Sequence, residues 1–445
     1  KARAPATRAT EPMKEWFQDR HLRSLLKNTS YLAVSKGVAA VGGLITLAFA
    51  GRSLGVVAFG LLILVHSYAQ AASGLTKFNS WQVVVRYGGP ALRGGDEARF
   101  RRALGFALGL DLASGLLTMI AAMLLAPLVA PLFGLPDELV PALILYCLLL
   151  PLMGAGAASG VLRLFDRFDL LGWQGTITAN VRAALTVLAW WQQWPLLAFI
   201  LIWFVTDLLG DLVMWWMAWR ELRRRDRLAG IRPTLRAGPL ERGWPFALSI
   251  NVNSALNTAW GPLARLLVGA LLSPAAAGLY RVASSIADAA QKPTDFLNKA
   301  FYPEVMRLDH REKAPWQLML RTMVLSALIG AVALLAVLVG GEWLLRVAFG
   351  APFVEAYGVM LVLLGVPLLM TVTFPLPAML HAIGRVNVPL IANLVGAIAY
   401  VGLIFPLTDR FGLVGAGAAF LAGRVVMMSV MALAVARERR RLRPS

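Results

Sequence analysis

Long apolar segments recur along the whole chain, and short polar segments separate them. At about 20 residues or more, each apolar segment is long enough to cross the ~30 Å hydrocarbon layer of a membrane as an α-helix. The segments lack the period-2 alternation that is typical of a membrane β-barrel. The pattern predicts an all-α polytopic membrane protein with about 12 transmembrane helices, at residues 29–51, 56–85, 103–131, 138–163, 168–192, 195–221, 243–271, 275–304, 315–341, 354–384, 386–407 and 411–436.

Composition and charge agree with this class of protein. Of the 445 residues, 58% are hydrophobic and 15% are charged, whereas a soluble protein has about 25% charged residues. The 43 Lys and Arg residues outnumber the 24 Asp and Glu residues, and most of them precede the first span, follow every second span or lie in the tail. By the positive-inside rule, this predicts a bacterial inner-membrane protein with both termini in the cytoplasm, and it argues against a nucleic-acid partner.

Enzyme motifs are not found in the sequence. It has no Gly-rich loop for nucleotide phosphates and no His, Cys or carboxylate cluster with metal-ligand spacing. The single cysteine, Cys147, lies in an apolar segment, so no disulfide forms within the chain. The first apolar segment is too long for a cleavable signal peptide. We expect that the protein is not an enzyme and that it has no cofactor. A coupling H⁺ or Na⁺ is the exception.

Sequence matches at a nearly constant offset indicate an internal repeat. Residues 51–61 match residues 269–279 at an offset of 218, and residues 133–136 match residues 349–352 at an offset of 216. Parallel repeats of this kind place a substrate site between two lobes. The predicted organisation is an interfacial amphipathic segment at 1–28, a first lobe of six helices at 29–221, a basic linker at 222–242, a second lobe of six helices at 243–436, and a basic tail at 437–445.

Charged residues repeat along one face of the predicted eighth span at steps of 7, 4, 3 and 4: Arg281, Asp288, Lys292, Asp295 and Lys299. The second span is the matching helix of the first lobe, and it carries a polar face with His66, Gln70, Lys77 and Trp81. A charge that faces lipid costs at least a few kcal/mol, so both faces should point to protein or water. Together they predict the lining of one central cavity.

Further ionisable residues are expected at membrane depth: Lys36, Asp111, Arg182, Asp207, Asp211, Arg265 and Arg424. Across these positions and the two polar faces, basic residues outnumber acidic ones. A watery cavity with surplus positive charge suits an anion, and Arg is well shaped for phosphate and carboxylate. Two structural explanations stay open. The charges of the eighth span can neutralise one another as i,i+3 and i,i+4 pairs, and Arg182, Arg265 and Arg424 can pair with the aspartates in a structural network.

Two stretches carry a resemblance to a known family. Residues 23–31, Arg-Ser-Leu-Leu-Lys-Asn-Thr-Ser-Tyr, and residues 48–60, Ala-Phe-Ala-Gly-Arg-Ser-Leu-Gly-Val-Val-Ala-Phe-Gly, resemble the polysaccharide-transport (Wzx-type) flippases. MATE multidrug exporters and lipid II flippases belong to the same superfamily. The resemblance implies two six-helix bundles around a central V-shaped cavity, lined by the first, second, seventh and eighth spans. It also implies that the protein moves an undecaprenyl-pyrophosphate-linked oligosaccharide from the cytoplasmic to the periplasmic leaflet, for O-antigen or exopolysaccharide synthesis.

The residue pattern fits this function, because a cationic cavity would solvate a pyrophosphate headgroup while the lipid tail stays in the membrane. We expect no nucleic-acid partner; the expected partners are the lipid-linked oligosaccharide, membrane lipids, and the polysaccharide polymerase and export machinery. The alternatives are a MATE-like multidrug or cation antiporter and a non-transporting scaffold of a polysaccharide-assembly complex. The predicted substrate-binding residues are Lys36, Lys77, Arg281, Lys292, Lys299, Arg182, Arg265 and Arg424. The predicted coupling-ion residues are Asp111, Asp207, Asp211 and Asp288, and no metal site is predicted.

The alternating charge of the polar segments makes the topology testable. Single cysteines at positions 135, 193 and 273 should react with a membrane-impermeant thiol reagent added from the periplasm, and cysteines at positions 95, 228 and 440 should not. Labelling of position 228 from the periplasm would overturn the predicted orientation.

Overall fold

The protein is helical throughout the part of the chain that the structure describes. This structure is a computed structural model, and it describes residues 20–238, 240–307, 314–385 and 387–442. Its first half contains α2 (Arg20–Thr76), α3 (Ser80–Val83), the π-helix η1 (Val84–Gly88), α4 (Gly89–Arg93), α5 (Glu97–Val129), α6 (Val140–Cys147), α7 (Gly156–Leu164), α8 (Phe168–Trp191) and α9 (Leu196–Arg224). Its second half contains α10 (Gly243–Thr258), α11 (Trp260–Leu271), α12 (Pro274–Arg307), α13 (Ala314–Ala348), the 3-10 helix η4 (Ala351–Ala356), α14 (Tyr357–Thr373), α15 (Pro375–Ala382) and α16 (Val388–Leu442).

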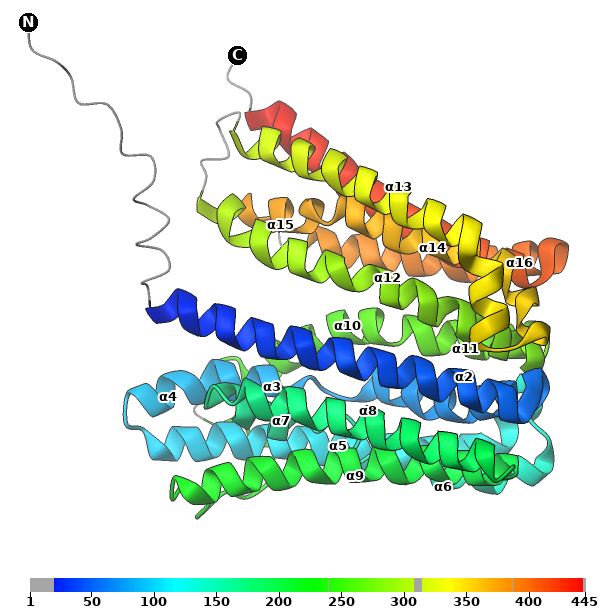
Figure 1. The fold of residues 1–445 in the computed structure, drawn as a ribbon. Helices are drawn as coiled ribbons and strands as arrows, with labels where there is room; N and C mark the ends of the chain where they lie inside the picture. The colour runs from blue at the N-terminus through cyan, green and yellow to red at the C-terminus, as the bar shows by residue number, and fades with distance from the viewer. Residues whose placement is uncertain (1–19, 239, 308–313, 386, 443–445) are drawn as a thin grey trace, which may run out of the picture.

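Two of these helices turn back at a glycine. α2 contains Gly55 with φ 70°, and α16 contains Gly412 with φ 56°, values that favour a residue without a β-carbon. Each of the two therefore accounts for two predicted spans. The fold has a terminal end, where α2 begins and α16 ends, and a distal end, where both helices turn back (Figure 1).

Six helical segments of the described residues are long and apolar enough to cross a membrane. They are Val34–Arg93, Glu97–Val129, Leu196–Arg224, Trp316–Ala348, Ala351–Ala382 and Val388–Arg441. The first and the last contain the glycine turns, and all six coincide with predicted spans. The all-α polytopic class is confirmed. The predicted amphipathic segment 1–28 lies mostly outside the described residues, although α2 is already helical from Arg20.

Several predicted spans are interrupted rather than continuous. The second span is not helical at residues 77–79 and continues as α3, η1 and α4. In the fourth span, turns at residues 148–154 separate α6 from α7. A backbone break at membrane depth is tolerated only where protein or a water-filled cavity surrounds it. The interruptions therefore point to the interior of the molecule.

The hydrophobic core is shared at the distal end and divided at the terminal end. One buried cluster joins both halves and includes Phe59 and Phe199 of the first half and Phe353 and Met360 of the second. At the terminal end there are two separate clusters. One surrounds α5 and α7 of the first half and takes in Ala247 at the start of α10, and the other lies among α13, α15 and α16 of the second half. The halves thus share a large core at the distal end, whereas at the terminal end, of the described residues, only the start of α10 packs on the first half.

A close backbone contact between the halves is made by α2 and α12 at the distal end. A β-carbon on Gly60 would lie 1.8 Å from the carbonyl oxygen of Pro274, and one on Gly278 would lie 3.2 Å from the Cα atom of Gly60. Gly60 and Gly278 are equivalent positions of the 218-residue repeat. Equivalent residues meet where an axis of pseudo-symmetry passes between the repeats, as two parallel lobes require. The absence of both β-carbons lets the helices touch through their backbones.

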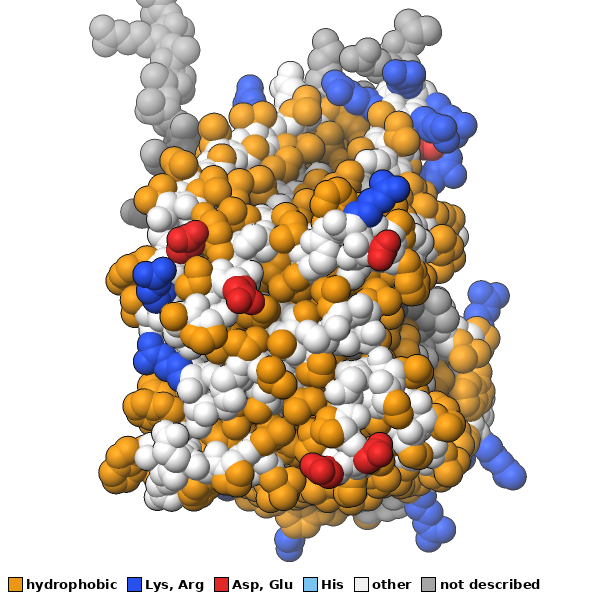
Figure 2. All heavy atoms as spheres, turned by 90° about the vertical axis from the view of Figure 1, so that its right-hand side faces the viewer, with side chains coloured by type: hydrophobic (Ala, Val, Ile, Leu, Met, Phe, Trp, Pro, Cys, Tyr) orange, Lys and Arg blue, Asp and Glu red, His pale blue; other side chains and the backbone are white. Residues whose placement is uncertain are grey.

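The surface at the distal end is mainly apolar, with scattered carboxylates and few basic side chains (Figure 2). Its exposed acidic residues are Asp137, Glu138, Glu342, Glu355 and Asp409. The long arginine-rich segments, by contrast, lie at the terminal end with the linker and the last turns of α9 and α16. This asymmetry is the charge pattern from which the cytoplasmic placement of the termini was predicted.

The glycine contact predicts a sharp difference between two alanine substitutions in α2. Gly60→Ala forces the helices apart, because its β-carbon meets backbone that cannot rotate away. We expect a loss of about 1–3 kcal/mol, the usual cost of overpacking, seen as a lower midpoint of thermal unfolding in detergent. Gly43→Ala is the control, because its β-carbon would have no atom within 4 Å. Equal midpoints for the two variants would contradict the proposed contact.

Candidate functional site

A cavity of ≈490 Å³ lies between the two halves. Residues 70–81 of the second span form much of its wall in the first half, and residues 254–265 of α10 and α11 form much of its wall in the second. Its charged lining residues are Lys77, Asp111, Arg265, Arg281 and Asp288. All five were among the predicted site residues, so the structure brings together side chains that are as far as 211 residues apart in the sequence.

Lys77 is held in the cavity wall by backbone carbonyls. It follows directly after the last residue of α2, and its Nζ donates hydrogen bonds to the carbonyl oxygens of Pro151 (3.4 Å) and Met153. Both carbonyls belong to the turns that separate α6 from α7, where they lack helical partners. The two interrupted spans thus complement each other, because one supplies an ammonium group and the other supplies free carbonyls. Carbonyl dipoles orient the charge of Lys77 without neutralising it.

Arg265 connects the two halves across the cavity. This α11 side chain is buried, with its residue only 6% exposed, and it donates from Nε to Ser67 Oγ (2.8 Å) and from an Nη to Gln70 Oε1 (2.9 Å). Both acceptors lie on α2 and are neutral. Arg265 therefore keeps its positive charge, and it forms a hydrogen-bonded bridge between the lobes on the distal side of Lys77.

Arg281 and the two carboxylates complete the charged lining. No ion pair to a carboxylate is found for Arg281 among the described side chains, and Asp288 lies two turns further along α12. Asp111 of α5 is almost fully buried, and its Oδ2 accepts a hydrogen bond from the Ala157 backbone N–H (2.7 Å). Its buried Oδ1 lacks a hydrogen-bond partner among the described residues. The lining thus carries three basic and two acidic groups that are not closed into ion pairs with one another.

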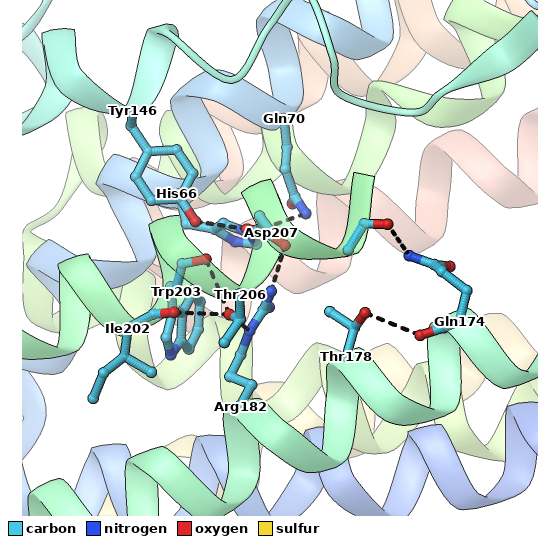
Figure 3. Close-up of polar contacts among 11 residues, drawn as sticks. His66, Gln70, Tyr146, Gln174, Thr178, Arg182, Ile202, Trp203, Thr206 and Asp207 are labelled. Atoms are coloured by element: carbon cyan, nitrogen blue, oxygen red, sulfur yellow. Dashed lines mark hydrogen bonds and ion pairs between the residues drawn. The ribbon is translucent and has the colours of Figure 1, made fainter. Parts of the chain in front are cut away.

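A second polar cluster is buried inside the first half (Figure 3). Asp207 of α9 is its centre, because Arg182 of α8 pairs with Oδ1 while Tyr146 of α6 donates to Oδ2 at 2.7 Å. Arg182 also donates from Nε to Thr206 Oγ1 at 2.8 Å. These bonds satisfy a buried carboxylate from two neighbouring helices, which a hydrocarbon environment demands.

Gln70 links the buried cluster to the cavity. His66 Nε2 lies 3.4 Å from Asp207 Oδ2 and also 3.4 Å from the amide nitrogen of Gln70. The same amide accepts from Arg265 through its oxygen. A continuous chain of polar contacts therefore runs from Arg265 of the second half, through Gln70 and His66, to the Asp207–Arg182 pair.

The remaining predicted site residues lie elsewhere. Arg182 and Asp207 belong to the buried cluster and do not line the cavity. Arg424 lies over the rings of Trp260 (4.6 Å) and Phe420 (5.4 Å), and its Nε has no hydrogen-bond partner among the described residues. Lys36 is exposed on α2 and Asp211 is half-buried on α9, both outside the cavity lining. Lys292 and Lys299 lie on α12 outside the side chains that the structure describes.

The structure changes one prediction about the second span and adds residues that the prediction missed. His66, Gln70, Lys77 and Trp81 do not share one face of a single helix, because the helix breaks at residue 77; His66 instead turns to Asp207. The carbonyls of Pro151 and Met153 were not predicted. Pro151 and Gly154 inside an apolar segment are the signal that indicates such a break. Among the described residues, no group of three His, Cys, Asp or Glu side chains is placed to hold a metal ion.

Comparisons with known proteins agree with the geometry. The sequence profile described as "Polysaccharide biosynthesis protein" matches residues 25–309. The chain is 38% identical over 347 residues to the inner membrane protein YghQ of Escherichia coli (strain K12), which covers 78% of this chain and 98% of that protein.

Two solved structures share the fold. The lipid II flippase MurJ in an inward closed conformation matches with a TM-score of 0.69 and 11% identity, over 92% of this chain and 89% of that chain. An inward-facing multidrug resistance MATE family transporter matches with a TM-score of 0.67 and 15% identity, over 93% and 95%. The two-lobed MATE-like fold predicted from the sequence is confirmed.

The buried cluster predicts non-additive effects of substitution. Arg182→Met should destabilise the protein by about 3 kcal/mol, the lower end for a broken buried pair, because it leaves a carboxylate that is only 20% exposed without its main partner. Adding Asp207→Asn to this variant should restore part of the loss, since the amide still bonds with Tyr146. Thermal unfolding of the two single variants and the double variant in detergent measures the coupling. If the stability lost by the double variant equals the sum of the losses of the two single variants, the two side chains do not stabilise each other.

Proposed function

The chain belongs to the polysaccharide biosynthesis protein family, and on this premise we propose that it is a flippase for lipid-linked oligosaccharides. In this proposal the substrate is an oligosaccharide repeat unit joined through pyrophosphate to undecaprenol. The protein moves the headgroup from the cytoplasmic to the periplasmic leaflet while the lipid tail stays in the membrane. The single observation that carries the proposal is the cavity between the halves, in which Lys77, Arg265 and Arg281 surround a space of ≈490 Å³.

The cavity has the chemistry that such a headgroup requires. Pyrophosphate is a dense anion, and ammonium and guanidinium groups form its strongest hydrogen bonds. Sugar hydroxyls need neutral donors and acceptors, which Gln70, Asn79 and Ser254 supply in the same lining. The cavity lies between the lobes, where a tail can remain in the hydrocarbon while the headgroup is enclosed.

The balance of charge favours an anion over an organic cation. Asp111 is buried and accepts a hydrogen bond from the Ala157 N–H. Asp288 is exposed, so it is the more accessible of the two carboxylates. Of the three basic groups, Lys77 and Arg265 are hydrogen-bonded to neutral acceptors. For Arg281, no ion pair with a described carboxylate is found. A multidrug exporter of the MATE type would require the opposite balance.

The shared core at the distal end suggests how access alternates. In this conformation the halves are joined at Gly60 and Gly278, and the cavity lies on the terminal side of the Arg265 bridge. Exposure of the cavity to the distal side requires α2 to part from both α11 and α12, which breaks the bonds from Arg265 to Ser67 and Gln70. We propose that substrate phosphate replaces these two neutral acceptors, so that binding itself weakens the bridge.

The same bridge offers a route for coupling to an ion. When Arg265 releases Gln70, the amide is free to reorient toward His66, which changes the contacts of Asp207. In this proposal H⁺ or Na⁺ acts at Asp207, or at Asp111 with its unpartnered Oδ1. The polysaccharide polymerase and export machinery would receive the transported unit.

Arg281 provides the test, because it lines the cavity and takes no part in the bridge. Arg281→Gln should reduce affinity for the lipid-linked intermediate by about ten- to a hundredfold, the value of one charge-assisted hydrogen bond to phosphate. Arg281→Lys should keep more of the activity. The measurement is the amount of lipid-linked oligosaccharide that accumulates on the cytoplasmic leaflet, together with the polysaccharide exported, in cells that carry only the variant.

The matched control is Arg321→Gln, which removes an exposed charge on α13 outside the cavity. Cells that carry only this variant should export polysaccharide normally. Normal export by Arg281→Gln, at a wild-type level of protein in the membrane, would overturn the assignment of the cavity to an anionic headgroup.

A further inference from the structure

The linker between the halves packs against α5. Thr234 donates its backbone N–H to the carbonyl oxygen of Gly105 (2.9 Å). A β-carbon on Gly105 would lie 2.4 Å from the carbonyl oxygen of Arg232, and one on Gly109 would lie 2.3 Å from that of Thr234. Two glycines one turn apart thus form a track on α5 that receives the linker backbone. We call residues 228–238 the strap.

A basic groove of ≈450 Å³ lies where the strap meets the start of α5. Its lining contains three charged residues, Arg101, Arg102 and Arg232, and no carboxylate; the other lining residues are Ala98, Gly230, Pro233 and Thr234. The three arginines come from two segments that are about 130 residues apart in the sequence, so only the docking of the strap gathers them.

Two of these arginines lie beside the strap. A β-carbon on Gly230 would lie 3.4 Å from Cδ of Arg101, and one on Gly238 would lie 3.6 Å from Nε of Arg102. Both glycines have positive φ, 80° and 55°, which lets the strap backbone turn close to the side chains. Both arginines are exposed, so their guanidinium groups are accessible to a ligand.

The arginines of the groove have no described carboxylate close enough to neutralise them. Four other arginines of the terminal end do have carboxylate partners within 3 Å: Arg167 with Asp169, Arg225 with Glu221, Arg227 with Glu97, and Arg385 with Glu438. For Arg101, Arg102 and Arg232, no ion pair is found among the described residues. The groove thus gathers three positive charges that no described carboxylate neutralises.

An apolar rim beside the groove indicates the source of the anion. Leu235 of the strap is 45% exposed, and Trp244, which donates its indole N–H to the Leu235 carbonyl oxygen (3.1 Å), is 37% exposed. An exposed leucine and tryptophan next to arginines are typical of the boundary between lipid headgroups and hydrocarbon. A free phosphate ion has no apolar part that could contact this rim, whereas a phospholipid has both a phosphate and acyl chains.

We propose that this groove binds the phosphate of an anionic phospholipid in the leaflet at the terminal end. The headgroup lies among the three arginines and an acyl chain runs along Leu235. A bound lipid would join α5 to the strap and so hold the linker against the first half as far as residue 238. This site is separate from the cavity and does not depend on the identity of the transported substrate.

The test uses the purified full-length protein and measures bound lipid by native mass spectrometry at matched concentrations of phosphatidylglycerol and phosphatidylcholine. Wild type should retain phosphatidylglycerol preferentially. The double variant R101Q/R102Q should retain at least about tenfold less, and R101K/R102K should keep most of the binding. The control R346Q/R410Q removes two exposed arginines at the distal end and should bind as wild type does.

Three outcomes would overturn the proposal. Wild type without a preference for phosphatidylglycerol means that the groove does not recognise an anionic lipid. An equal loss in the R346Q/R410Q control means that only net charge matters. Binding of inorganic phosphate that R101Q/R102Q abolishes, without retention of phosphatidylglycerol, assigns the groove to a soluble anion. Should R101Q/R102Q fail to fold, Arg232→Gln on the exposed strap gives the same comparison with one charge removed.

Discussion

The arrangement of the molecule depends on one backbone contact, between Gly60 of α2 and the Pro274–Gly278 turn of α12. Because neither glycine has a β-carbon, the two helices approach until backbone meets backbone. The halves are thereby joined at the distal end, where they share one core. Toward the terminal end, the cluster around α5 and α7 reaches only the start of α10, and α13, α15 and α16 have a separate cluster. The cavity lies between the halves on the terminal side of the glycine contact.

The second constraint is the high cost of an unpartnered charge at membrane depth, and the protein meets it in two ways. In the interior of the first half, Arg182 and Asp207 neutralise each other and are completed by hydroxyl groups. In the cavity, Lys77 and Arg265 are bonded to neutral carbonyl, hydroxyl and amide oxygens. The first arrangement offers no net charge to an anionic ligand, because the charges of Arg182 and Asp207 cancel. The second keeps positive charge available to such a ligand.

When the lobes move relative to each other, the few contacts that cross the cavity must break or change. Arg265 is the most buried of these, and its acceptor Gln70 also contacts His66. The linker makes a different contribution. Its strap is packed on α5, and Tyr87 of η1 donates to the Glu241 carbonyl oxygen at 2.8 Å, so the first half extends structurally as far as Glu241. At Arg242, with a φ of 53°, the chain changes direction sharply before α10 begins. The start of α10 still packs on the first half, because the ring of Trp244 lies 5.5 Å from that of Phe106 and the ring of Phe246 lies 5.7 Å from that of Tyr87.

The sequence alone determined the helical membrane class and the approximate positions of apolar spans, and it indicated the internal repeat and the candidate residues Lys77, Arg265, Arg281 and the aspartates. These properties follow from local hydrophobicity and from spacing, which need no knowledge of neighbours. Only the tertiary structure decided which charges share a site. Arg182 and Arg265 look alike in the sequence, yet one pairs with Asp207 and the other spans the cavity. The break at Lys77 could not be predicted from helical periodicity, because its partners are carbonyls freed by another interrupted span. The physical reason is the same in each case: in a low-dielectric interior, the role of a charge is set by the groups within a few ångströms of it, and these come from distant parts of the chain.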